Sequence, residues 1–75
     1  MITAKPTVEE MHKAFTDSYR FLKAKFADAE NIDWMNLPKE CAEVCKQNDH
    51  SSLIMILMGG CYEYLTKLNE GKITK

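Results

Sequence analysis

The sequence predicts an all-α fold, a small three-helix bundle of two long helices and one short helix that is completed by oligomerisation. Two observations lead to this prediction. Apolar residues recur at three- and four-residue steps in three separate segments, which is the period of a helix. The 75 residues contain only 3 Gly and 2 Pro and no repeat, low-complexity tract or Ser/Gly linker, so we expect a single domain over residues 1–75.

The first helix is expected over about residues 7–29. Thr7 can cap its start while the side chain of Glu10 reaches back to the Thr7 backbone, which is the reciprocal capping box. Apolar side chains then follow at helical spacing and fill an arc of roughly 80° on the helical wheel. We expect this stripe to face the core. Its members are Val8, Met11, Phe15, Tyr19, Leu22 and Phe26.

The second helix is expected over about residues 37–47, after a connector at residues 30–36. Asn36 can cap this helix, and Pro38 falls in the first turn, where proline is tolerated. The connector is too apolar for an idle loop, so we expect it to fold back over the end of the bundle with Trp34 as its anchor.

The third helix is expected over about residues 51–69, with Ser51 or Asp49 as its cap and Gly71 as its stop. A short flexible tail would follow at residues 71–75. We expect the first and third helices to pack antiparallel, with the second helix crossing them.

The first half of the third helix is apolar nearly all round. Met55 and Tyr62 lie opposite its main seam, and Gly59 and Gly60 in mid-helix each cost roughly 1 kcal/mol relative to alanine. Such a helix is normally covered on more than one side. Two interpretations stay open: the helix is central and touches both others, or its second face meets another copy of the chain or a different protein. The candidate interface residues are Met55, Ile56, Gly59, Tyr62 and Phe21.

The cysteines allow a metal site but do not require one. Cys41 and Cys45 are four residues apart and stack on one helical face, and with Cys61 and His50 they could form a Cys₃His zinc site. The simpler interpretation is that the thiols are small buried side chains between the second and third helices. We therefore expect no cofactor and no metal, with these four residues as the candidate ligands.

Composition and motifs argue against catalysis and nucleic-acid binding. Asp49-His50-Ser51-Ser52 contains the residue types of a hydrolase triad, but neighbours in sequence do not supply convergent geometry, and we expect no enzyme activity. The net charge is -1, and the helix after the turn at residues 48–50 carries no Lys or Arg before Lys67. A helix that reads the major groove needs polar base contacts and flanking cations.

The sequence is most typical of a small non-enzymatic protein-interaction or assembly module. Its expected partner is itself, as a homodimer, or another protein. An odd number of cysteines, no apolar leader and no long apolar stretch predict a cytoplasmic protein without a membrane span. The alternatives are a nucleic-acid-binding accessory protein and a Cys/His metal-binding protein.

Overall fold

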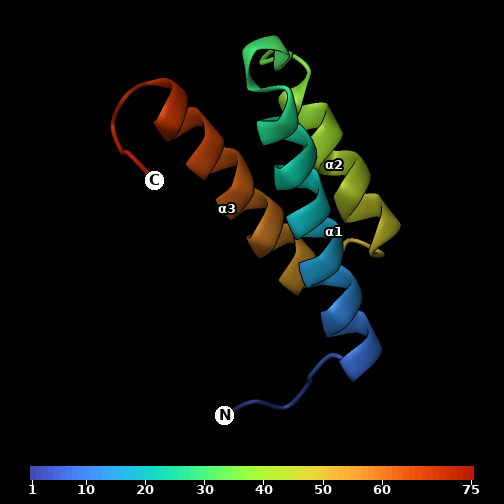
Figure 1. Ribbon diagram of the computed structural model, residues 1–75. Helices are drawn as coiled ribbons and strands as arrows, with labels where there is room; N and C mark the ends of the chain where they lie inside the picture. The colour runs from blue at the N-terminus through green and yellow to red at the C-terminus, as the bar shows by residue number, and fades with distance from the viewer.

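The computed structural model describes all 75 residues and is a small three-helix bundle without strands. The first and third helices are long and the second is short. In chain order the elements are α1 (Val8–Ala27), a 3-10 turn η1 (Ala29–Asn31), α2 (Leu37–Gln47) and α3 (Ser52–Asn69). Helices α1 and α3 run in the same direction, and α2, which lies between them in the chain, runs in the opposite direction (Figure 1). The prediction that the first and third helices are antiparallel is therefore wrong, because the short α2 and its two brief connections reverse the chain twice.

The helix ends follow from local hydrogen bonding. The Thr7 hydroxyl accepts from the Glu10 backbone N–H at 3.1 Å, and Glu10 Oε1 accepts from the Thr7 N–H at 2.8 Å, so the capping box at the start of α1 is confirmed. Ser51 caps α3 by accepting from the Ile54 N–H. Asn36 precedes α2 but makes no side-chain cap, and Gly71 takes the positive φ of 74° that ends α3.

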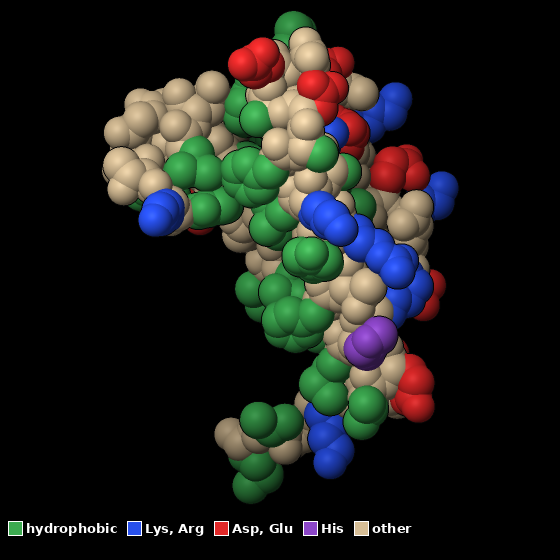
Figure 2. Space-filling model, viewed as in Figure 1, with side chains coloured by type: hydrophobic (Ala, Val, Ile, Leu, Met, Phe, Trp, Pro, Cys, Tyr) green, Lys and Arg blue, Asp and Glu red, His purple; other side chains and the backbone are tan.

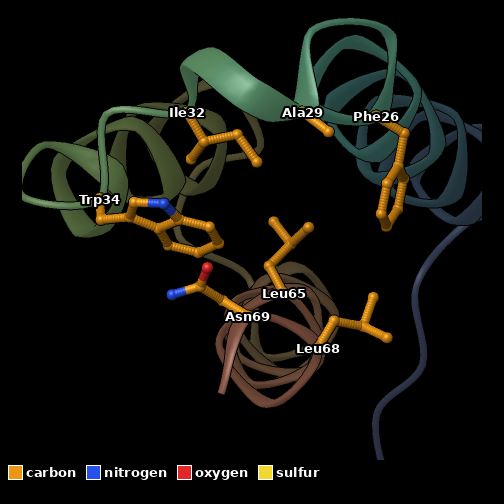
Figure 3. A pocket seen from close by; sticks show the side chains of 7 residues that line it. All are labelled: Phe26, Ala29, Ile32, Trp34, Leu65, Leu68 and Asn69. Atoms are coloured by element: carbon orange, nitrogen blue, oxygen red, sulfur yellow. The ribbon is translucent and has the colours of Figure 1, made fainter. Parts of the chain in front are cut away.

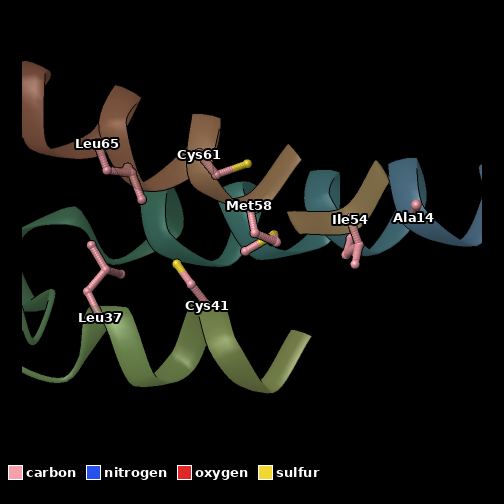
Figure 4. Close-up of a cluster of buried hydrophobic side chains, with 7 residues drawn as sticks. All are labelled: Ala14, Leu37, Cys41, Ile54, Met58, Cys61 and Leu65. Carbon is pink, nitrogen blue, oxygen red and sulfur yellow. The ribbon is translucent and has the colours of Figure 1, made fainter. Parts of the chain in front are cut away.

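The core is a thin seam centred on α3, which packs against both α1 and α2. Figure 4 shows α3 side chains pointing toward the other two helices, with Met58 near the middle of the seam. The interpretation of the third helix as the central one is therefore confirmed. Only eight residues are buried in all. They are Ala14, Ser18, Leu37, Cys41, Ile54, Met58, Cys61 and Leu65.

Contacts outside the seam join α1 to the α2 side of the molecule. Lys25 Nζ lies 2.5 Å from Glu40 Oε1, which links α1 to α2. Trp34 is half-buried and packs against the core, as expected for an anchor in the connector. Its neighbour Met35 is almost fully exposed, so the expectation that the connector folds back over the bundle holds for Trp34 but not for Met35. The result is an elongated molecule of 41 × 24 × 18 Å.

Candidate interaction surface

The apolar stripe of α1 is largely exposed to solvent. The side chains of Phe15 and Tyr19 are 57% and 63% exposed, whereas Ala14 and Ser18 are buried on the neighbouring face of the same helix. Small side chains let the backbones of two helices approach closely, and the Ser18 hydroxyl is satisfied by donating to the Ala14 carbonyl at 2.8 Å. The prediction that the stripe faces the core is wrong for its exposed members. These are Val8, Met11, Phe15, Tyr19 and Phe26, which we call the α1 stripe; Leu22, half-buried, adjoins it.

Helix α3 extends this apolar surface. The Phe26 ring meets the Tyr64 ring edge-on, with centroids 6.2 Å apart, so the α1 stripe adjoins the side of α3 that carries Tyr64. Leu57 and Gly60 fall on that same side by helical spacing, and Leu57 is only half-buried. Hydrophobic side chains form a band over α1 and its junction with α3 (Figure 2). We call the α1 stripe together with Leu57, Gly60 and Tyr64 the α1–α3 face.

A shallow apolar hollow lies at the end of this face, where the C-terminal half of α3 diverges from α1. Phe26 and Leu68 stand on one side of it and Trp34 on the other, with the Leu65 side chain between them (Figure 3). Six of the seven lining residues are hydrophobic. Because one side chain in the hollow belongs to the α1 stripe, the hollow and the α1–α3 face form one continuous surface.

The four α3 residues expected at an interface are all on the surface. Met55 is 55% exposed, Ile56 73% and Tyr62 38%, and Gly59 is exposed as well. By helical spacing Gly59 shares a side of α3 with Met55 and Tyr62, whereas Gly60 falls on the side of Tyr64. A Cβ atom at either glycine would meet nothing within 4 Å, so packing within the chain does not explain either glycine.

Phe21, the fifth expected interface residue, stands apart from the others. It is half-buried, packs against the core and borders a hollow with Val44 and Gln47 of α2. Lys25 Nζ lies 5.4 Å from its ring centroid. The structure therefore places Phe21 beside α2 and does not join it to the exposed residues of α3.

The border of the α1 stripe is mixed in charge. Lys23 Nζ lies 5.9 Å from the centroid of the Tyr19 ring, and Figure 2 shows a row of Lys and Arg side chains beside the hydrophobic band. Lys13 is paired with Asp17 at 2.6 Å, and Asp17 also accepts from Asn48 Nδ2 at 2.9 Å. These hydrogen bonds, with that of Lys13 the strongest, hold the pKa of Asp17 below its ordinary value.

The thiols lie between α2 and α3. Cys41 and Cys61 are buried there and Cys45 is half-buried, as the simpler interpretation of the cysteines predicts. Burial raises the pKa of Cys41 to about 11, with smaller contributions from the neighbouring thiols, and burial also raises that of Cys61. His50 is exposed in the turn between α2 and α3, with a positive φ of 51°. No group of three or more His, Cys, Asp or Glu side chains is arranged to hold a metal ion.

None of the helices combines the length and the apolar character that crossing a membrane requires. No protein-family model, curated protein or solved structure matches this chain.

The apolar character of the α1 stripe can be predicted from helical spacing, but its exposure cannot. The spacing alone does not say whether the partner of the stripe lies in the same chain.

Proposed function

We propose that this protein is a non-enzymatic protein-interaction module and that the α1–α3 face is its docking surface. The observation that carries the proposal is the exposure of five large apolar residues along one side of α1, two of them phenylalanines and one a tyrosine. Aromatic residues and methionine are enriched where proteins bind each other. Monomeric proteins rarely leave a large contiguous apolar surface uncovered.

The total surface area supports the same proposal. The chain exposes 5883 Å², whereas a folded monomer of this mass exposes roughly 4,700 Å². The extended residues at the two ends of the chain account for part of the excess of about 1,200 Å². A standard protein–protein interface buries about 800 Å² on each partner, which is of the same size as this excess.

Site-directed photo-crosslinking in the cells that make the protein tests the proposal. A photoreactive amino acid in place of Phe15 is expected to give an adduct of one defined mass, because that side chain would lie in an interface. The matched control is the same amino acid in place of Lys39, which is exposed on α2 and away from the α1–α3 face. Adducts at neither position, or the same diffuse set at both, would refute the proposed docking surface.

A further inference from the structure

We infer that the α1–α3 face binds a second copy of this chain, with the α1 stripes of the two copies packed antiparallel about a two-fold axis. This inference rests on the proposed function and adds to it the identity of the partner and the arrangement of the helices. Three properties of α1 support it: the order of its apolar residues, the charges along its border and the length of surface it offers.

Four of the five residues of the α1 stripe map onto one another when the helix is turned end for end. A reversal about residue 17 exchanges Val8 with Phe26 and Phe15 with Tyr19, whereas Met11 falls opposite the stem of Lys23. A two-fold interface needs a surface that is complementary to itself in this way. The reversal therefore places apolar side chains opposite apolar side chains at both ends and in the middle of the stripe.

The charges along the exposed border of α1 suit the same reversal. Glu9 and Lys23 lie close to four turns apart, so they fall on the same side of the helix, one near each end of the stripe. Neither residue takes part in an ion pair within the chain. In an antiparallel pair the same borders meet, so Glu9 of each copy would lie near Lys23 of the other. A parallel pair would not bring these opposite charges together.

The length of the exposed stripe suits pairing with one further helix. The 20 residues of α1 form a rod of about 30 Å, and the hollow beside Phe26 and Leu68 extends the surface at one end. Two-fold pairing would cover both copies at once and leave no open edge for further addition.

Analytical ultracentrifugation of the purified chain at micromolar concentration tests the inference. We expect the wild type to sediment as a dimer and Phe15→Glu to raise the dissociation constant about tenfold or more, because a carboxylate would be buried between two apolar stripes. Tyr62→Glu is the matched control: it places the same charge on an exposed aromatic position of α3, outside the α1–α3 face, and should leave the dimer intact. Far-UV circular dichroism checks that both variants keep their helices.

Charge reversal tests the antiparallel arrangement. Glu9→Lys alone and Lys23→Glu alone should each weaken the dimer by about two- to fivefold at low salt, and the double variant should restore the wild-type dissociation constant. A double variant as weak as the sum of the single ones would overturn the antiparallel pairing.

The remaining outcomes separate this inference from the proposed function. Two results would overturn the inference that a second copy binds the α1–α3 face. One is a wild type that is monomeric, and the other is a dimer that dissociates with Tyr62→Glu but persists with Phe15→Glu. A photo-crosslinked adduct at residue 15 whose mass differs from twice that of the chain would then identify a different protein as the partner, and the proposed function would stand. The absence of any adduct at residue 15 would refute both the dimer and the proposed docking surface.

Discussion

The rings of Phe26 and Tyr64 meet edge-on, with 6.2 Å between their centroids, and this contact joins the C-terminal halves of α1 and α3. Through this contact, the exposed α1 stripe is connected to α3. The two helices run in the same direction and separate progressively toward their C-terminal ends (Figure 1), so the contact connects them where they are already diverging.

In the monomeric Phe15→Glu background, Phe26→Ala should lower the free energy of unfolding by about 1–2 kcal/mol, since it removes the aromatic contact and the buried part of the ring. Urea denaturation followed by circular dichroism measures the change. Met35→Ala is the control, because the Met35 side chain contacts almost nothing, and its effect should stay within about 0.5 kcal/mol. Equal effects of the two substitutions would contradict the role given to the ring pair.

Met58 and Met55 form a matched pair on one helix. Met58 is buried where α3 meets the other helices, whereas Met55 is exposed. Met58→Ala should destabilise the fold by about 2–5 kcal/mol because it opens a cavity in a core of only eight buried residues. Met55→Ala should cost well under about 1 kcal/mol in a variant held monomeric by Phe15→Glu. Thermal denaturation of both variants distinguishes them.

Substitution by alanine should raise the free energy of unfolding at the two mid-helix glycines and lower it at Gly71. A methyl group at Gly59 or Gly60 meets no atom within 4 Å, so Gly59→Ala and Gly60→Ala should each raise the free energy of unfolding by about 0.5–1 kcal/mol through helix propensity. Gly71→Ala should lower it by about 1 kcal/mol, because Gly71 has a positive φ of 74°. A loss of stability at Gly59 or Gly60 in the monomeric Phe15→Glu background would contradict this.

Asp17 should give the folded state a pH-dependent contribution. Its pKa in the folded chain is lowered, chiefly by the hydrogen bond from Lys13, so the stabilisation is present above the unfolded value of about 3.9 and is lost as the pH falls through the lowered folded value. Asp17→Asn should therefore be less stable than the wild type at neutral pH, and the two should converge in acid. Urea midpoints across this pH range measure the difference. A constant difference at every pH would rule out the carboxylate as its source.

Alkylation should distinguish the three thiols. The pKa of Cys41 is raised to about 11 by burial and that of Cys61 is raised by the same cause, so few of these thiolates exist at pH 8. Cys45 is half-buried and should react with iodoacetamide first. Mass spectrometry of peptides from the folded protein, with urea-unfolded protein as the control, gives the order. Modification of Cys41 as fast as Cys45 would contradict the buried arrangement.

The elements of the fold could be predicted because local rules determine them. The sequence predicts helices over about residues 7–29, 37–47 and 51–69, and the observed bounds are Val8–Ala27, Leu37–Gln47 and Ser52–Asn69. Thr7 with Glu10, and Ser51, are hydrogen-bonding caps that depend only on near neighbours.

The face of α1 that packs inside the chain could not be predicted in the same way. Helical spacing identifies Phe15 and Tyr19 as parts of an apolar stripe, but the burial of Ala14 and Ser18 depends on how closely α3 approaches, which is a tertiary property. The same holds for Phe21, whose neighbour is α2, a helix that the spacing of α1 does not reveal. The direction of α3 relative to α1 could not be predicted from spacing either, because it depends on how the two connections turn the chain.

The first six residues of α1, Val8 to Lys13, include no buried side chain, and this end of the helix projects beyond the start of α3 (Figure 1). Backbone amides there can exchange their hydrogens with deuterated solvent through fraying alone, whereas amides around Met58 and Cys61 require a larger opening. A lone chain would thus show a steep gradient of exchange rates along α1, and a slowing of the rates near Val8 would report directly that another helix lies against it.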